Sequence, residues 1–127
     1  MLIKVVTTMN IDNKVIESFH LMYDDFPEPV MLIHKSRKML AINKAYKLLG
    51  IAPGMFCNKQ GATENHKGCL ADKALKAQCA AWLKYPAPNR PNDSAIAFWL
   101  PVNGYPDIYV HFAVGNTKDY TVAPTFE

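Results

Sequence analysis

The sequence predicts an α+β domain, because an amphipathic helix, an early pair of strands and a late pair of strands follow one another along the chain. The 127 residues fit one domain, and 50% of them are hydrophobic, which is enough for a single core without disulfide staples. The 14 Lys and Arg residues exceed the 11 Asp and Glu residues only slightly, for a formal charge of +3, and they are scattered. This weak charge predicts no nucleic-acid surface.

Apolar runs are too short for a membrane protein. None approaches the roughly 20 residues that cross a bilayer, and residues 2–6 are too few for a signal-peptide core. We therefore expect a cytoplasmic protein without a membrane partner. The sequence also lacks a phosphate-binding glycine loop, a Gly-x-Ser-x-Gly elbow and a recognisable pair of catalytic carboxylates, so it predicts no enzyme.

Residues 11–26 predict the first helix. Apolar side chains recur there at intervals of three and four, at Ile11, Val15, Phe19, Met22 and Phe26. This spacing predicts an amphipathic helix of about four turns. Pro27 and Pro29 end it, because neither has a backbone N–H to donate and each restricts the residue before it.

A strand pair and a short helix come next. The apolar runs 30–33 and 39–42, joined by a short polar stretch, predict an antiparallel hairpin. Asn43 is a suitable cap for a helix over residues 44–49, and Gly50 suits its carboxyl end.

The second half begins with another helix, starting near Cys69. Its helical spacing is set by Leu70, Ala74, Leu75 and Gln78. Residues 79–85 fit either a continuation of this helix or a strand that carries Trp82 and Tyr85. We favour the strand.

Two alternating strands close the domain. Residues 94–102 and 107–114 alternate side chains with period two, and the Asn103-Gly104 pair between them is typical of a hairpin turn. Residues 117–127 show no periodicity and predict a flexible tail.

Taken in order, several segments resemble the PAS domain. The stretch FPEPV at residues 26–30 looks like the start of the first PAS strand. The stretch MLAINKAYKLLG at residues 39–50 is similar to the second strand and first short helix of that family, with Asn43, Ala45 and Gly50 at its recurrent positions. The pattern at residues 98–114 looks like the last two PAS strands.

The resemblance implies a five-stranded antiparallel sheet with short helices on one face. It would place the PAS-like domain at residues 27–116, after an N-terminal segment (1–10) and an N-terminal helix (11–26), and before the tail at 117–127. It further implies a sensory module, whose pocket in this family holds haem, flavin, a small metabolite or nothing.

We expect the candidate ligand contacts to be Asn43, Trp99 and His111, since each offers a polar group beside apolar strand residues. Haem would need only one imidazole, from His66 or His111. The first helix resembles the helices that pair PAS domains, and it predicts a homodimer. Its expected contacts are Val15, Phe19 and Met22. A separate effector protein is a further possible partner. The alternative to a ligand-binding module is a ligand-free interaction domain.

The segment CNKQGATENHKGC at residues 57–69 leaves three interpretations open. It looks similar to a cysteine-containing variant found in some bacterial PAS domains. Cys57, His66 and Cys69 could bind a metal, with Cys79 or water as fourth ligand, because thiolate and imidazole both suit zinc. Cys57 and Cys69 could instead form a thiol switch, or the segment could be only a loop.

Overall fold

A computed structural model describes residues 13–50, 69–88 and 90–126. Helices and strands follow in the order α1 (Asn13–Tyr23), β1 (Val30–His34), β2 (Met39–Ile42), α2 (Lys44–Lys47), α3 (Ala71–Ala77), β3 (Ala81–Pro86), β4 (Ser94–Val102) and β5 (Tyr105–Val114). The predictions for residues 1–10, Cys57 and His66 lie outside the described residues. None of the described helices is long and apolar enough to cross a membrane.

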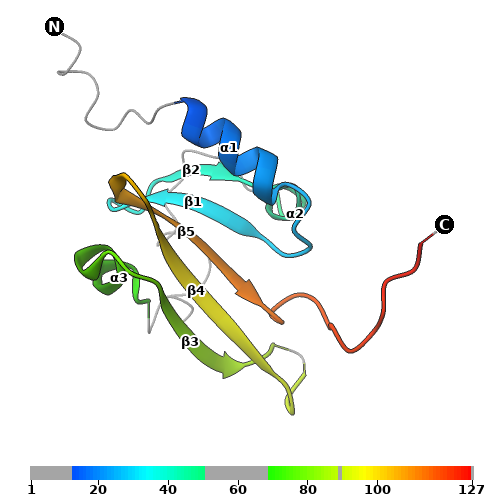
Figure 1. Ribbon diagram of the computed structural model, residues 1–127. Helices are drawn as coiled ribbons and strands as arrows, with labels where there is room; N and C mark the ends of the chain where they lie inside the picture. The colour runs from blue at the N-terminus through cyan, green and yellow to red at the C-terminus, as the bar shows by residue number, and fades with distance from the viewer. Residues whose placement is uncertain (1–12, 51–68, 89, 127) are drawn as a thin grey trace, which may run out of the picture.

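The strands form one five-stranded sheet in the order β2-β1-β5-β4-β3, and every neighbouring pair is antiparallel (Figure 1). Strand β5 lies at the centre, where Val110 is opposite Leu32 of β1 and His111 is opposite Trp99 of β4. This topology confirms the predicted α+β class with a five-stranded antiparallel sheet.

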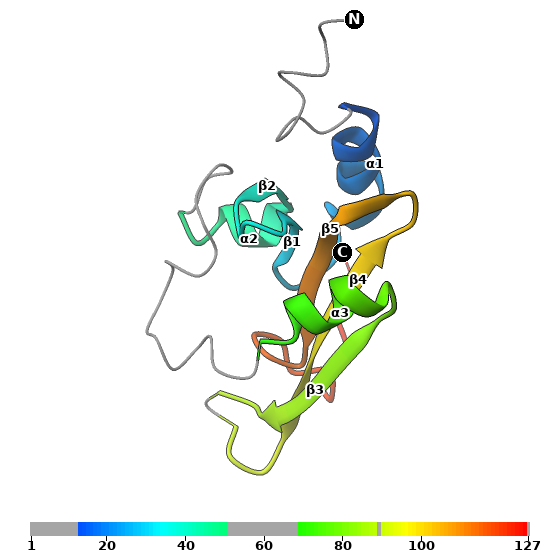
Figure 2. The same cartoon turned by 90° about the vertical axis from the view of Figure 1, so that its left-hand side faces the viewer.

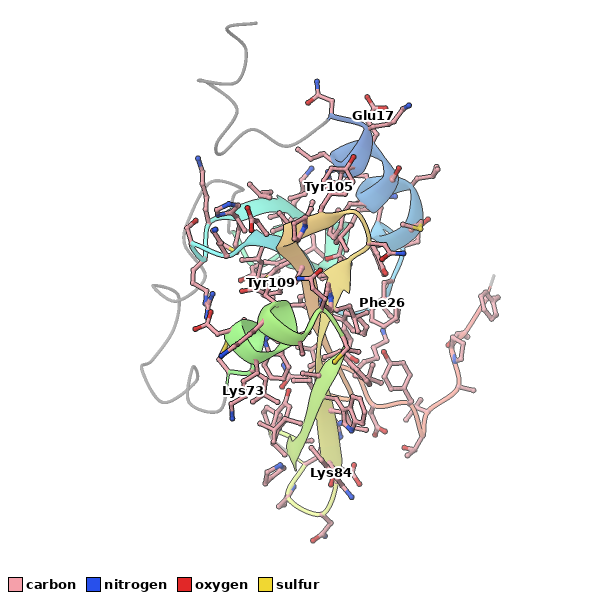
Figure 3. The ribbon with its side chains drawn as sticks, turned by 60° about the vertical axis from the view of Figure 1, so that its left-hand side comes forward. Glu17, Phe26, Lys73, Lys84, Tyr105 and Tyr109 are labelled. Carbon is pink, nitrogen blue, oxygen red and sulfur yellow. The ribbon has the colours of Figure 1, made fainter. Side chains whose placement is uncertain are left out.

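Side chains alternate between the two faces of the sheet along each strand, and both faces are covered. The inner face carries Ile33 and Tyr109, which pack with Tyr46 of α2 and with residues of α3. The outer face carries Leu32 and Val110, which pack with residues of α1. Figure 2 shows α3 lying across the sheet, and Figure 3 shows Tyr109 on the side of α3 and Phe26 on the opposite side.

Helix α1 packs on the outer face over β1 and β2. Phe19 is its buried anchor at 2% exposure, and the helix ends at Tyr23, before Pro27. Asn43 caps α2 as predicted: its Oδ1 accepts a hydrogen bond from the Tyr46 N–H at 3.1 Å. Gly50 follows with φ of +80°, a conformation that glycine adopts without strain.

Residues 79–85 belong mainly to a strand, so the favoured prediction is confirmed. Helix α3 ends at Ala77, and the left-handed φ of +51° at its C-cap residue Gln78 turns the chain back. Strand β3 then pairs with β4 and places Ala81 and Tyr85 against the inner-face cluster. On its other side it exposes Trp82, 64% of which is accessible.

The segment after β5 is attached to the domain. Thr117 and Tyr120 both donate hydrogen bonds to the carboxylate of Glu28, which precedes β1. The boundary predicted between residues 116 and 117 therefore falls inside a hydrogen-bonded cluster.

Candidate functional site

Trp99 and His111 form a stacked pair on the inner face. They come from adjacent strands, β4 and β5, in directly opposite positions. Their ring centroids are 4.7 Å apart and the rings are inclined by only 14°. Because side chains alternate along β5, His111 lies on the other face from Val110 and Phe112, and the register puts it beside the indole of Trp99.

The hydrogen bond of His111 fixes which ring nitrogen carries the proton. Its Nδ1 lies 2.7 Å from the carbonyl oxygen of Phe98, and a carbonyl can only accept, so Nδ1 donates. Burial lowers the pKa of His111 and outweighs the opposing effect of this bond, which favours the neutral ring. The neutral ring then presents Nε2 as a hydrogen-bond acceptor.

Trp99 contributes an unmatched donor to the same place. The residue is only 4% exposed, and its Nε1–H has no hydrogen-bond partner within the described residues. Leaving a buried donor unmatched costs about 1–3 kcal/mol. A donor and an acceptor therefore lie on two stacked rings, which suits a ligand group that both accepts and donates, such as an amide, a carboxylic acid or a hydroxyl.

Asn43 is placed differently from the other two predicted ligand contacts. Its Oδ1 accepts from the N–H groups of Val30 and Tyr46, and its Nδ2 is bonded to three carbonyl oxygens. These belong to Tyr23, Phe26 and Glu28, at 3.0, 3.3 and 3.0 Å. With 0% exposure and this set of bonds, Asn43 ties the end of α1 to the start of β1 and leaves no group for a ligand.

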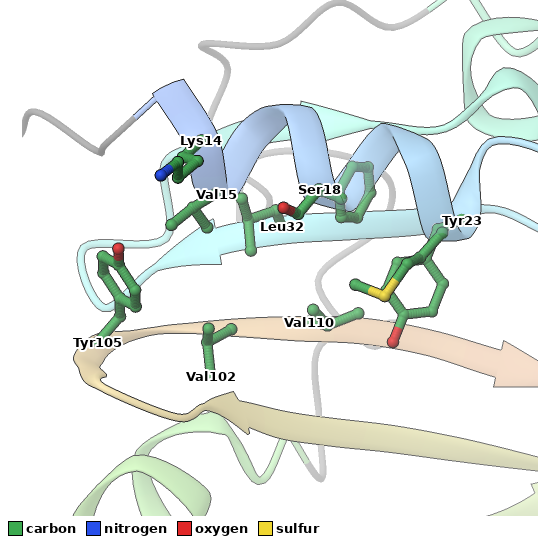
Figure 4. Close-up of a pocket in the computed structure, with 10 residues that line it drawn as sticks. Lys14, Val15, Ser18, Tyr23, Leu32, Val102, Tyr105 and Val110 are labelled. Carbon is green, nitrogen blue, oxygen red and sulfur yellow. The ribbon is translucent and has the colours of Figure 1, made fainter.

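A groove lies on the outer face between α1 and the sheet, with a volume of about 280 Å³. Its apolar lining includes Val15, Phe19 and Met22 from α1, and Leu32, Val102 and Val110 from the sheet. Figure 4 shows Tyr105 at one end of this groove and Tyr23 at the other.

The three residues predicted for dimerisation separate into two kinds. Phe19 is buried in the outer-face core, and Val15 packs against the same cluster, so both stabilise their own domain. Met22 is 66% exposed beside Leu21, which is 86% exposed. Leu21 and Met22, unlike Phe19, are therefore exposed on α1.

The architecture is matched by a solved PAS domain. The PAS domain of BvgS from Bordetella pertussis matches 87% of this chain over 91% of its own length, with a TM-score of 0.63 and 14% sequence identity. The chain has the PAS fold. A domain of an HTR-like protein from Haloarcula marismortui matches 72% of this chain over 99% of its length, with a TM-score of 0.55 and 16% identity. No protein-family model and no curated protein matches the sequence.

The PAS fold alone does not identify a ligand, because one fold can carry many sites. Cys57 and His66 lie outside the described residues, while Cys69 and Cys79 are free and exposed. Across residues 13–50, 69–88 and 90–126, no three His, Cys, Asp or Glu side chains are grouped to hold a metal ion. The metal site and the thiol switch stay predictions.

Glu28 is a buried residue that the sequence patterns did not identify. This carboxylate is fully buried, just before the first strand of the PAS fold, and accepts hydrogen bonds from residues 115, 116, 117 and 120. One signal was present: a charged residue stands between Pro27 and Pro29, directly before an apolar strand. Its partners lie 87 to 92 positions away, where no local pattern identifies them.

Proposed function

We propose that the protein is a sensory module that binds a small organic molecule through Trp99 and His111 and acts by associating with a second copy of itself. The unmatched Nε1–H of Trp99 carries the proposal, because a bound acceptor would remove the cost of leaving this donor unpaired. The PAS fold supports a sensory role without naming the ligand.

Small neighbours support a ligand at this pair. Ala81 lies opposite Trp99 on β3, and Ala97 and Ala113 lie opposite each other, two positions along β4 and β5. Each of these side chains ends at a single methyl group. The acceptor Nε2 of His111 and the donor Nε1 of Trp99 would then orient a ligand that offers both complementary groups.

The ligand test compares two tryptophan variants. Native mass spectrometry of wild type, Trp99→Phe and Trp82→Phe is expected to show a bound small molecule in wild type and in Trp82→Phe, and a reduced amount in Trp99→Phe. Trp82 is the matched control, because 64% of it is exposed on the other face of the sheet. Equal occupancy in all three proteins would contradict the proposed site.

A protein purified without ligand is tested by a thermal shift with amides, carboxylic acids and hydroxy compounds. A compound at 100 times its Kd adds about 2.7 kcal/mol of stability, which raises the Tm by roughly 10 °C. No shift with any of these classes would contradict a ligand of this chemistry. An absorption spectrum of fresh protein checks for haem. A Soret band would show that the bound molecule is a haem held through an imidazole instead of the organic ligand proposed here.

The proposed association with a second copy rests on Leu21 and Met22. Both are exposed apolar residues on α1, and Met22 also lines the outer groove. In a two-fold dimer the same surface of both copies forms the interface. The exposed Leu21 and Met22 of each copy could then pack against the groove beside α1 of the other copy.

Sedimentation of Leu21→Glu tests this association. Burying the new carboxylate without a partner would weaken the dimer by at least about 2 kcal/mol, or roughly 30-fold in Kd. Leu48→Glu is the control, because Leu48, the residue directly after α2, is 87% exposed and does not line the groove. A monomeric wild type, or a dimer that tolerates Leu21→Glu, would contradict this part and leave the ligand site standing.

A further inference from the structure

Glu28 binds the segment that leaves the last strand, here named the C-terminal strap (residues 115–121). Its Oε2 accepts from the Gly115 N–H at 2.7 Å and from the Tyr120 hydroxyl at 2.8 Å. Its Oε1 accepts from the N–H groups of Asn116 and Thr117 at 2.9 and 2.7 Å, and from the Thr117 hydroxyl at 3.2 Å. A single buried side chain thus holds both ends of the strap, whose path away from β5 is visible in Figure 1.

The carboxylate is matched by neutral donors. Burial alone would raise the pKa of Glu28, but the hydrogen bonds from the Thr117 and Gly115 backbone and from the Tyr120 and Thr117 hydroxyls outweigh it, so the pKa is lowered. The carboxylate is therefore ionised at neutral pH. The pKa of Tyr120 is raised to about 12 by burial and by its bond to Glu28, so this hydroxyl remains a donor.

Two more side chains hold the strap to the sheet end. The Tyr85 hydroxyl on β3 donates to Asn116 Oδ1 at 2.8 Å. Arg90, in the connection before β4, donates through Nη2 to the carbonyl of Gly115. The ring of Tyr85 packs against the inner-face cluster, so the strap is connected to the face that carries Trp99 and His111.

Polar contacts, rather than buried apolar surface, hold the strap. Tyr120 is 50% exposed, and beyond it Val122 and Phe126 are 67% and 87% exposed. The strand amides of the core depend on the buried clusters of both faces, whereas the strap depends on hydrogen bonds with Glu28, Tyr85 and Arg90. Segments with few buried apolar contacts open at lower free energy than the rest of a domain.

The other side of Glu28 is fixed to α1. Its backbone carbonyl accepts from Asn43 Nδ2, which is also bonded to the carbonyls of Tyr23 and Phe26 at the end of α1. A movement of α1 relative to β5 therefore changes the position of the carboxylate relative to the three backbone donors of the strap.

We propose that Glu28 is a clasp with two states: a closed state in which it holds the C-terminal strap, and an open state in which the strap detaches while the sheet stays folded. The clasp links the end of α1 to the chain that follows β5. It needs no ligand, so it stands or falls independently of the site at Trp99 and His111.

The first test is hydrogen exchange by NMR on the full chain. In wild type, the amides of Asn116 and Thr117 are expected to exchange faster than those of β4 and β5, with little dependence on low urea concentrations, because a local opening exposes little surface. Exchange of the strap at the same rate and urea dependence as the core would overturn the proposal, because the strap would then open only with the whole domain.

Glu28→Gln sharpens this test. The amide replaces one acceptor oxygen by a donor that faces other donors, so the exchange of Asn116 and Thr117 is expected to accelerate by about 10- to 100-fold with core rates unchanged. The control Glu17→Gln makes the same charge change at an exposed position of α1. Unchanged strap exchange in Glu28→Gln would overturn the clasp.

Tyr120→Phe covers the case in which Glu28→Gln does not fold. It removes one hydrogen bond and keeps the carboxylate, so a smaller acceleration of about three- to tenfold is expected. The link to α1 is tested with Ile16→Ala, which loosens the packing of α1. Faster strap exchange is expected in that variant, with no change in the control Leu48→Ala, an exposed position directly after α2. Equal strap exchange rates in both variants would overturn the link.

Discussion

Two buried polar groups of this domain differ in how completely their hydrogen bonds are matched. The Asn43–Glu28 cluster uses both side chains fully, with five bonds made by the Asn43 amide and five accepted by the Glu28 carboxylate. The Trp99–His111 pair has one bond to Phe98 and an indole donor with no partner in the described part of the chain.

The difference separates structure from site. A fully matched buried network fixes one arrangement of the backbone, because every alternative leaves a polar group unpaired. A buried donor that finds no partner among the described residues carries a cost there, and a bound molecule can remove it. Substitutions in the two clusters should therefore have effects of different size, and the following predictions proceed from the largest to the smallest.

The largest effect is expected for Asn43→Ala. The substitution removes five hydrogen bonds and the cap of α2, and it leaves backbone groups of Val30 and Tyr46 without that acceptor. We expect the free energy of unfolding to fall by about 3–5 kcal/mol in urea denaturation. Asn92→Ala, at an exposed position, is the control and should stay within about 0.5 kcal/mol. A loss below about 1 kcal/mol for Asn43→Ala would break the comparison.

The next effect is a pH dependence that comes from Glu28. Because its pKa is lower in the folded state than the usual value of 4.5, the carboxylate contributes its stability above that pH and loses it as the pH falls through the folded pKa. Its titratable neighbours Tyr85 and Tyr120 have raised pKa values and therefore stay protonated as the pH falls. Wild type should therefore lose stability more steeply than Glu28→Gln as the pH falls below 4.5.

Urea titrations of both proteins at several pH values measure this difference. Subtraction removes the contribution of other carboxylates, including Asp119, whose pKa is lowered mainly by the hydroxyl of Thr121. The exposed control Glu17→Gln should follow wild type. Parallel curves for wild type and Glu28→Gln would show that the carboxylate is not held more tightly when ionised.

Local patterns predicted most of the fold. The three- and four-residue spacing located α1, the two apolar runs located β1 and β2, and Asn43 was identified as the cap of α2. Each of these depends on residues that are near one another in the chain. Residues 79–85 fit either a helix or a strand from the sequence alone, and the structure has a strand at Ala81–Pro86.

The sites were harder to predict because they depend on register and distant contacts. Phe19 and Met22 share one apolar stripe, yet the sheet covers Phe19 and leaves Met22 exposed, which the helix pattern cannot distinguish. Alternation placed Trp99 and His111 on strand faces, but only the pairing of β4 with β5 brings their rings together. The segment after residue 116 shows no periodicity, and its partner Glu28 lies far away in the sequence, so no local pattern reveals these hydrogen bonds.

A smaller effect is expected at the glycine that starts the strap. Gly115 has φ of +85°, and a Cβ there would lie 3.2 Å from the carbonyl oxygen of Ser94. Gly104 has nearly the same φ, +86°, with no atom within 4 Å of such a Cβ. The left-handed conformation costs an alanine about 1 kcal/mol at either position. The loss of stability should be larger for Gly115→Ala than for Gly104→Ala, because only at Gly115 does the new methyl group also have to displace backbone. Equal losses of stability would show that the strap accommodates a methyl group.

The smallest effect is expected for Trp99→Phe, where a large buried side chain is replaced. The change removes apolar area, which destabilises, and also removes the unmatched Nε1–H, which stabilises by a similar amount of about 1–3 kcal/mol. We therefore expect a net change below about 1 kcal/mol in urea denaturation, close to that of the exposed control Trp82→Phe. A loss of 3 kcal/mol or more, roughly what removing a matched buried group costs, would mean that the indole is already paired within the protein. That result would place Trp99 with Asn43 and Glu28 as a structural residue, and it would remove the main support for a ligand at this pair.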